Sequence, residues 1–409
     1  MNFEIEHDAC GIGTVVQIDG KQSYDVLDKA LHIVEKLEHR AGKDASGKVG
    51  DGVGILLQIS DDFFRNTLKK DNIKLPEHYG VGMFFLPRNK LLLNQHKKMF
   101  EKLVEQEGCT FITWRKVPCD DSILGQKAKD CMPSIYQAFV QGDTDLEQKL
   151  YVIRREFEKS CKETYVASLS SRTIVYKGMF LVSQLRKFYF DLQDENYKSA
   201  IAIVHSRFST NTTPSWQRAH PNRYIAHNGE INTIRANVNK MLAREESMHS
   251  KFLDENSSKI LPIINTSGSD SAMLDNALEF LVMNGMPLEK AVMILIPEPW
   301  KHQTMDQKKK DFYHYYATMM EPWDGPAAIL FSDGQKVGAV LDRNGLRPSR
   351  YYLTSDNMLI LSSEVGVLDI DEKKIVKKSR LEPGKMLLVD TKKKKLIEDY
   401  DLKNEYASS

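Results

Sequence analysis

Residues 1–13 read MNFEIEHDACGIG, so that Cys10 stands nine residues from the start of the chain and directly before Gly11-Ile12-Gly13. Three roles are open to a cysteine at this position. It can be a small buried hydrophobic residue, a metal-binding or redox thiol, or a nucleophile that becomes the first residue once residues 1–9 are removed. The rest of the sequence has to distinguish between these roles.

The five cysteines argue against the second role. They are odd in number and form no C-x-x-C pair, and they stand at positions 10, 109, 119, 131 and 161. This spacing does not suit a disulfide framework, a zinc site or an iron–sulfur cluster, and we therefore expect no metal and a reducing compartment.

Composition narrows the class of protein further. The 409 residues are 41% hydrophobic and 28% charged, with a formal net charge of +1, which is typical of a folded globular protein. Neither nucleic acid nor a membrane surface is indicated as a partner. Residues 1–9 lack the basic and apolar regions of a secretory signal, and we expect a cytoplasmic protein.

The hydrophobic pattern predicts one large mixed domain with antiparallel β structure. Apolar residues recur at helical spacing between Val26 and Leu37, and GDGVGILLQIS (50–60) predicts a turn into a buried strand. Residues from about 62 to 165 alternate helical and strand patterns without obvious chemistry, and we expect them to be largely an α/β insertion. Hairpin-like units follow towards the C-terminus, with Lys392–Lys395 as a solvated hairpin tip.

HNGEIN (227–232) contains the first candidate for catalysis. Asn-Gly is a common tight-turn dipeptide, and a turn is the simplest interpretation of this pair. The alternative is functional: the side chain of Asn228 and the backbone N–H of Gly229 are two neutral donors, which is what an oxyanion hole requires.

Two further motifs carry charged residues. In HSRFSTNT (205–212), Arg207 comes at the end of an apolar strand, where its planar guanidinium can bind a carboxylate through two hydrogen bonds. In SGSDSA (267–272), Asp270 stands at the start of a helix. It is there either as an N-cap or as a carboxylate that binds an ammonium group.

Taken together, these motifs describe a site for the α-amino-acid end of a substrate that is attacked at a side-chain carbonyl. Cys10 supplies the nucleophile. If residues 1–9 are removed, its own α-amine titrates near pH 7.7–8.0 and can accept the thiol proton, so that no separate base is needed.

The same motifs give the sequence a family resemblance. Cys-Gly-Ile-Gly, HSRFSTN, HNGEIN and SGSDS resemble the class II, or N-terminal nucleophile, glutamine amidotransferases. Longer stretches, such as FSTNTTPSWQRAHPNRYIAHNGEINTIRAN and EPWDGPAAILFSDGQKVGAVLDRNGLRPSRYYLT, are similar to the N-terminal amidotransferase domain of glutamate synthase large subunits. The resemblance runs from Cys10 to about residue 400.

The resemblance implies an α+β fold, the four-layer αββα sandwich of N-terminal nucleophile hydrolases, formed by residues 10–409 behind a propeptide-like leader at 1–9. It also implies a role for each motif residue. Cys10 would be the nucleophile, Asn228 and Gly229 the oxyanion hole, and Arg207 and Asp270 the groups that hold glutamine. Other motif residues are expected as possible parts of the pocket: Arg40, His205, Thr210, Asn211, His227, Glu230 and Ser269.

The implied reaction is hydrolysis of the glutamine amide through a γ-glutamyl thioester, which gives glutamate and ammonia for a separate synthase domain or subunit. The flavin (FMN) and the iron–sulfur cluster of such an enzyme are expected only in that partner, and no cofactor is expected in this chain. Two alternatives stay open. The chain can be a non-catalytic module that senses glutamine, or an N-terminal-cysteine hydrolase that acts on another amide.

One further segment allows two interpretations. In DRNGLRPSRYY (342–352), we expect a structural turn with Arg347 in an ion pair beneath it. The alternative is that this segment shapes the glutamine pocket or the interface with the synthase.

Overall fold

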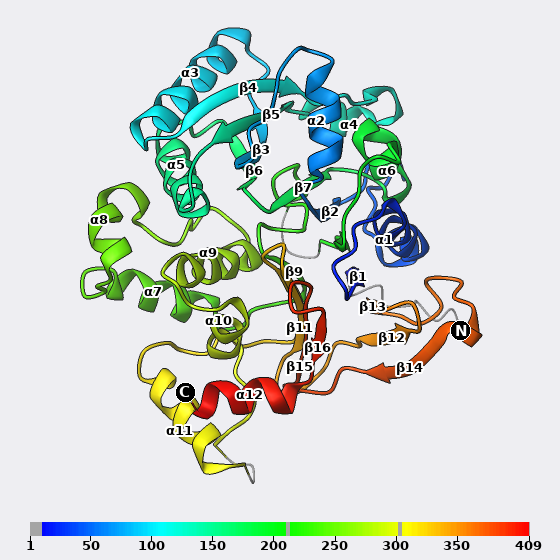
Figure 1. The fold of residues 1–409 in the computed structure, drawn as a ribbon, viewed down its shortest axis with the longest axis vertical. Helices are drawn as coiled ribbons and strands as arrows, with labels where there is room; N and C mark the ends of the chain where they lie inside the picture. Colours follow the sequence, from blue (N-terminus) through cyan, green and yellow to red (C-terminus); the bar gives the residue numbers. More distant parts are fainter. Residues whose placement is uncertain (1–9, 210–212, 302–304, 409) are drawn as a thin grey trace.

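The structure is a computed structural model of the chain, and it describes residues 10–209, 213–301 and 305–408. Two antiparallel sheets form its centre (Figure 1). The larger sheet has seven strands in the order β14-β12-β13-β1-β8-β2-β7, with these bounds: β1 Gly11–Gln17, β2 Val53–Gln58, β7 Thr173–Gly178, β8 Ile201–Ser206, β12 Arg350–Thr354, β13 Met358–Ser362 and β14 Ile375–Arg380.

The second sheet has five strands in the order β16-β15-β11-β10-β9. Their bounds are β9 Ile225–Gly229, β10 Ala327–Ser332, β11 Lys336–Leu341, β15 Met386–Asp390 and β16 Lys395–Ile397. The strand β9 therefore lies at an edge of this sheet and is paired only with β10. Lys392–Lys394 lie in the turn between β15 and β16, as expected of a hairpin tip, although Lys395 already belongs to β16.

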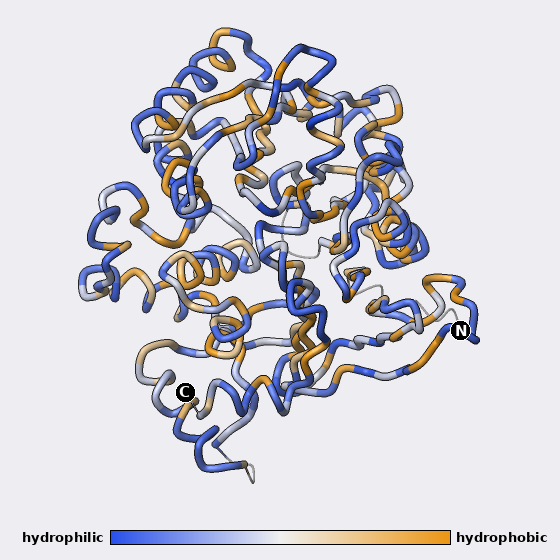
Figure 2. Tube along the Cα trace, viewed as in Figure 1, coloured by the Kyte–Doolittle hydropathy of each residue, from blue (hydrophilic) through white to orange (hydrophobic). Residues whose placement is uncertain are grey.

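The two sheets pack face to face through alternate residues of their strands. Ile12, Leu56 and Ile203 of the larger sheet share one buried cluster with Ala226 and Leu330 of the smaller sheet. Because successive side chains of a strand point to opposite faces, the intervening residues face outward, towards the helices. Hydrophobic strand segments at the centre appear in orange in Figure 2, whereas the helices alternate between orange and blue.

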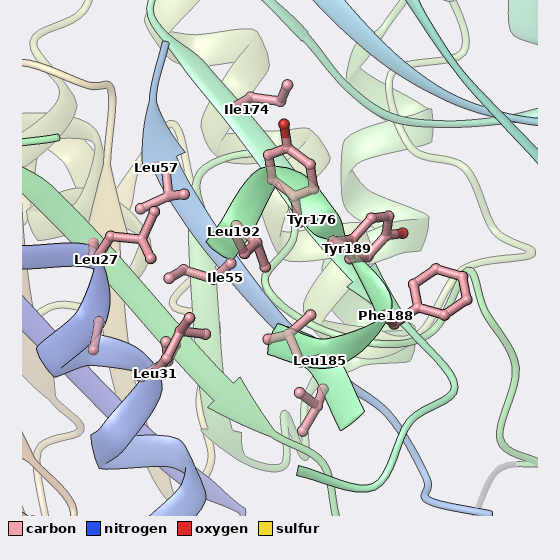
Figure 3. Packing of buried hydrophobic residues seen from close by; sticks show 14 of the residues in the cluster. Leu27, Leu31, Ile55, Leu57, Ile174, Tyr176, Leu185, Phe188, Tyr189 and Leu192 are labelled. Atoms are coloured by element: carbon pink, nitrogen blue, oxygen red, sulfur yellow. The ribbon is translucent and has the colours of Figure 1, made fainter. Parts of the chain in front are cut away.

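Helices cover both outer faces. On the larger sheet, Leu27 and Leu31 of α1 (Tyr24–Lys36) pack in one cluster with Ile55 and Leu57 of β2, as Figure 3 shows. On the smaller sheet, α9 (Asp270–Met283) and α10 (Leu288–Leu295) cover the outer side of β9, β10 and β15. The order helix, sheet, sheet, helix is the predicted αββα sandwich, and the fold class is confirmed.

A third sheet lies beside this sandwich. It has the order β4-β5-β3-β6, with β3 Tyr79–Leu86, β4 Thr110–Lys116, β5 Ser134–Gln141 and β6 Tyr165–Ser170. It packs on α3 (Lys90–Gln106) and α5 (Leu146–Ser160) in a core of its own. Strands β3 to β5 and both helices lie in the region where an insertion is expected from the sequence, whereas β6 begins at its expected end. The division at about residues 62 and 165 stays a prediction.

The remaining helices lie around these layers: α2 Asp61–Lys69, α4 Gln126–Asp130, α6 Leu185–Phe188, α7 Ile234–Arg244, α8 Lys251–Ile260, α11 Gln307–Ala317 and α12 Asp399–Ser408. In the part of the chain that the structure describes, none of the helices combines the length and the apolar character that crossing a membrane requires.

Candidate active site

Strand register places Cys10 beside Arg207. Gly11 at the start of β1 is paired with Ser206 at the end of β8, so the residues just outside this pair, Cys10 and Arg207, are neighbours. The backbone N–H of Phe208 donates to the sulfur of Cys10 over 3.3 Å. Close packing explains the small residue after Cys10, because a Cβ at Gly11 would lie 2.6 Å from Ser206 Oγ.

The thiol of Cys10 is held in its neutral form. Burial raises its pKa, and the opposing effects of the Phe208 N–H and of the positive charges on Arg207 and Arg347 are smaller. The attacking species of a cysteine nucleophile is the thiolate. Cys10 therefore needs a base close to its sulfur.

Asn228 and Gly229 end the edge strand β9. The pair does not form the tight turn that its sequence favours, because β9 continues through Gly229 in register with Ala327 of β10. Asn228 is 1% exposed, and neither its Oδ1 nor its Nδ2 has a hydrogen-bond partner among the described residues. A buried amide without partners is costly, which indicates that its partner is a ligand or water.

The backbone of Gly229 has a conformation that suits glycine. Its φ is +146°, and a Cβ would overlap the carbonyl oxygen of Pro326. The next residue, Glu230, donates its N–H to Pro326 over 3.0 Å. Because alternate residues of an antiparallel strand direct their N–H groups to opposite sides, the N–H of Gly229 faces the open edge of the sheet.

The loop before β2 fixes the backbone of Arg207. Its N–H donates to Gly52 over 2.8 Å, and its carbonyl accepts from Gly42 over 3.0 Å. Asp51 in the same loop accepts from the N–H of Ser209 over 2.7 Å. Burial lowers the pKa of Arg207, and the neighbouring Cys10 and Asp51 partly offset this effect. The guanidinium is thus a buried positive charge next to the thiol.

Asp270 is the first residue of α9. The N-cap, one of the two roles considered for Asp270, is Ser269 instead. Ser269 Oγ accepts from the N–H of Ala272 over 3.2 Å. Asp270 Oδ2 instead accepts from the N–H of Ile231, over 3.0 Å, in the segment that follows the proposed oxyanion donors. This contact joins the helix layer to the end of β9.

These groups line one cavity of about 290 Å³. The cavity contains the candidate nucleophile Cys10, a buried arginine, an aspartate and the two oxyanion candidates at the end of β9. Its described lining is Cys10, Arg207, Phe208, Ser209, His220, His227, Asn228, Gly229, Glu230, Ile231, Ile234, Ser269, Asp270, Ser271 and Arg347. Five residues chosen from four separate motifs therefore meet in space, and their individual roles stay predictions.

Comparison with known proteins gives this cavity a family context. The model of the family "Glutamine amidotransferases class-II" matches residues 10–409, and the match begins at Cys10. The chain belongs to the class II glutamine amidotransferases. The predicted family is confirmed.

Relatives of this amidotransferase chain are named as glutamate synthases. The large chain of glutamate synthase (NADPH) from Bacillus subtilis is 48% identical over 99% of this chain and 27% of its own length. The chloroplastic ferredoxin-dependent enzyme of Spinacia oleracea is 44% identical over 99% of this chain and 26% of its own length. The NADH-dependent glutamate synthase of Saccharomyces cerevisiae is 42% identical over 98% of this chain and 20% of its own length. The chain spans about a quarter of the length of these relatives.

A solved structure, the glutamine phosphoribosylpyrophosphate amidotransferase of B. subtilis, is similar over 94% of this chain and 48% of its own. Its identity is 15% and its TM-score is 0.38. The fold assignment above rests on the layers and their cores.

Other residues predicted for the amidotransferase pocket have different positions. His227, Glu230 and Ser269 line the cavity. Arg40 and His205 do not: Arg40 is paired with Glu364, and His205 lies between the sheets, where its Nε2 donates to the carbonyl of His227 over 3.0 Å. Thr210 and Asn211 lie outside the described residues.

Two ionisable residues of the amidotransferase cavity are not among the predicted site residues. Arg347 lies in its wall, so the alternative interpretation of DRNGLRPSRYY, that it shapes the pocket, is the one the structure favours. His220 is the other: its ring stacks on that of His205 with the centroids 4.5 Å apart, and neither of its ring nitrogens has a described partner. Arg347 follows the Asn-Gly turn dipeptide of DRNGLRPSRYY, and this motif pointed to it in the sequence. Nothing in the sequence singles out His220.

Proposed function

We propose that this chain hydrolyses the side-chain amide of glutamine, with Cys10 as nucleophile, and supplies the ammonia to a glutamate-synthase-type partner domain or subunit. The observation that carries the proposal is the single cavity that holds Cys10, Arg207, Asn228, Gly229 and Asp270. Membership of the class II glutamine amidotransferases and the names of the relatives support it.

In this proposal, the two ends of glutamine are bound by different layers of the sandwich. The guanidinium of Arg207, after β8, binds the α-carboxylate, and the carboxylate of Asp270, on α9, binds the α-ammonium group. The side-chain amide carbon of glutamine is thereby held at the sulfur of Cys10.

The chemistry begins with cleavage of the Ala9–Cys10 peptide bond, which frees the α-amine of Cys10. This amine takes the thiol proton, and the thiolate attacks the amide carbon. Asn228 Nδ2 and the Gly229 N–H donate to the oxygen that becomes negative. The C–N bond then breaks as the α-ammonium group returns the proton to the leaving nitrogen, so that ammonia and a γ-glutamyl thioester form. Water hydrolyses the thioester to glutamate and regenerates the thiol.

The acceptor of the ammonia belongs to the part of a glutamate synthase that this chain does not cover. We place the flavin (FMN) and the iron–sulfur cluster in that part rather than here, and we place the protein in nitrogen assimilation in the cytoplasm.

The central test is intact mass spectrometry followed by an assay of ammonia release from glutamine, asparagine and a γ-glutamyl analogue. We expect loss of residues 1–9 and release that is specific for glutamine. Cys10→Ala should abolish ammonia release and keep glutamine binding, measured by calorimetry, because the binding groups are untouched. A processed protein that binds glutamine and never releases ammonia would contradict the proposal and favour a sensing module.

A second test addresses the carboxylate-binding role of Arg207. Arg207→Lys keeps the charge and loses the two-point geometry, so KM for glutamine should rise at least tenfold with a smaller change in kcat. Arg235→Lys, on the exposed side of α7, is the matched control and should leave both constants unchanged. An unchanged KM in Arg207→Lys would remove this role.

A further inference from the structure

A second cavity of about 290 Å³ lies behind the N-terminus of α9, and its wall is strongly basic. Its positively charged lining residues come from α5, from the segment after it and from residues 217–223. They are Arg155, Lys159, Lys162, Arg218 and Arg223. Glu158 is the single carboxylate among the described residues of this wall. The name "basic cavity" is used for this site below.

Glu158 does not neutralise the basic cavity, because arginines already surround it. Its carboxylate is paired with Arg154 over 2.8 Å, with Arg223 over 2.8 Å and with Arg155 over 3.3 Å. Burial works to raise the pKa of Glu158, but these three arginines outweigh it and lower the pKa to about 2. Arg154 lies outside the wall and is also paired with Glu279, whereas Arg155 and Arg223 of the wall share Glu158, which leaves the wall with excess positive charge.

The inner wall also contains donors that have no acceptor. Asn222 is 5% exposed, and its Nδ2 has no hydrogen-bond partner among the described residues. The same holds for Nε of Arg223, whose side chain is 12% exposed. Buried donors in native proteins are paired with protein, water or a bound ion, so two orphaned donors in one basic wall indicate a ligand with acceptor oxygens.

The positive groups also crowd one another. Lys159 has its pKa lowered by burial and by the neighbouring charges of Arg155 and Lys162, and the opposing effects of Glu156 and Glu245, which lie outside the wall, do not cancel the shift. A side chain of opposite charge in the cavity would relieve this repulsion, and the described wall offers only the occupied Glu158. An anion from outside would do so instead.

We propose that the basic cavity is a binding site for a small, doubly charged oxyanion, held by its arginine and lysine side chains and by Nδ2 of Asn222. The shared chemistry is that of a short dicarboxylate or of phosphate. An amino acid fits less well, since the carboxylate of Glu158 is engaged and no other described carboxylate in the wall can bind an ammonium group.

The site is separate from the glutamine cavity and adjacent to it. Ser269, the N-cap of α9, lines both cavities, and residues 217–223 supply Asn222 to one wall and His220 to the other. The inference is independent of the proposed glutaminase activity, because it rests on a different set of side chains.

The experiment is isothermal titration of the full chain with succinate and with inorganic phosphate at constant ionic strength. We expect saturable binding of at least one of them. The anion that binds more tightly shows whether the ligand is a dicarboxylate or phosphate. Chloride and glutamine are titrated as controls for a singly charged anion and for an amino acid. Binding should weaken at least tenfold in Asn222→Leu and in the double variant Lys159→Gln/Lys162→Gln.

The matched control is Lys69→Gln/Lys98→Gln, which removes two exposed lysines on α2 and α3 and should bind as the wild type does. The lysine double variant keeps the test decisive if Asn222→Leu does not fold. The absence of saturable heat with both anions, or equal affinity in the cavity variants and the control, would overturn the proposal. Since binding is measured without turnover, this result is independent of ammonia release.

Discussion

Asn228 is a buried amide that makes no hydrogen bond to any described residue. Its place at the end of β9 brings a donor to the cavity that contains Cys10. Such a residue is costly to the fold, and in the proposed function its hydrogen-bond partner comes with the substrate. Asn228 is therefore a position at which an effect on catalysis can be told apart from an effect on stability.

Asn228→Ala should therefore lower kcat for glutamine by about 100-fold to 1000-fold, which is typical for the loss of one oxyanion donor. The free energy of unfolding should change little, since no protein hydrogen bond is lost. Steady-state ammonia release and urea denaturation measure the two quantities.

Asn237→Ala is the control for Asn228→Ala. Asn237 is also buried, but its Nδ2 donates to Pro322 over 3.0 Å and its Oδ1 accepts from Thr233 over 2.6 Å. This variant should lose about 1–3 kcal/mol of stability and keep kcat. If both variants lose stability and activity in parallel, Asn228 has a structural role instead.

At the scale of the element, α9 carries Asp270 into the site through its N-cap. Because Ser269 Oγ accepts the N–H of Ala272 in the first turn, the carboxylate of Asp270 is not needed as the helix cap. It accepts from the N–H of Ile231 instead and lines the cavity. The helix start and the substrate pocket are thus built from consecutive residues.

Ser269→Ala should cost about 1 kcal/mol of stability, the usual value of an N-cap, and should raise KM for glutamine several-fold as Asp270 loosens. Ser250 caps α8 in the same way, accepting from Leu253 over 3.0 Å, and lines neither cavity. Ser250→Ala should therefore cost similar stability with KM unchanged. Equal KM values in the two variants would show that capping does not position Asp270.

Local elements of this fold follow from sequence, whereas their pairing does not. Apolar spacing in α1 and the apolar run of β2 predict a helix and a strand, and both are present. Asn228-Gly229 has the composition of a tight turn, yet β9 runs through it because Ala327 and Pro326 pair alongside, about 100 residues away in the chain. Long-range pairing of this kind overrides turn preference and leaves no local signal.

The candidate site was predictable where chemistry is carried by short motifs. Cys10, Arg207, Asn228, Gly229 and Asp270 were chosen from residue type alone, and the fold brings them to one cavity. His220 could not be chosen, because its place depends on stacking against His205 between the sheets. Arg40, a possible part of the pocket, is not in the described lining for a similar reason: Glu364, far along the chain, pairs with it.

At the scale of the whole molecule, three buried histidines, two in the wall of the cavity and one beside it, link stability to pH. Burial lowers the pKa of His205 to about 3 and that of His220 well below its ordinary value. His227 has its pKa lowered in the same way, although the negative charge of Asp270 opposes the shift. In the unfolded chain a histidine titrates near pH 6.5.

The unfolded state therefore binds protons below about pH 6.5 that the folded state does not, and stability should fall as the pH falls from about 6.5 towards 3. Each such histidine contributes up to about 1.4 kcal/mol per pH unit within this window. Urea denaturation at several pH values should show the slope, and His220→Gln should reduce it.

His249→Gln is the control for the pH series, since the side chain of His249 is 76% exposed. It should keep the slope of the wild type. Identical slopes in His220→Gln and the wild type would mean that His220 is not the group that takes up a proton on unfolding.

The interface between the two sheets determines how the protein loses activity on heating. Cys10 and Arg207 directly flank strands β1 and β8 of the larger sheet, Asn228 and Gly229 end a strand of the smaller sheet, and Asp270 belongs to the helix layer outside it. A slide of one layer against another by an ångström would leave every strand and helix intact and still separate nucleophile from oxyanion donors. Glutamine turnover should therefore disappear several degrees below the temperature at which far-ultraviolet circular dichroism records melting, which makes turnover the more sensitive gauge of sandwich alignment.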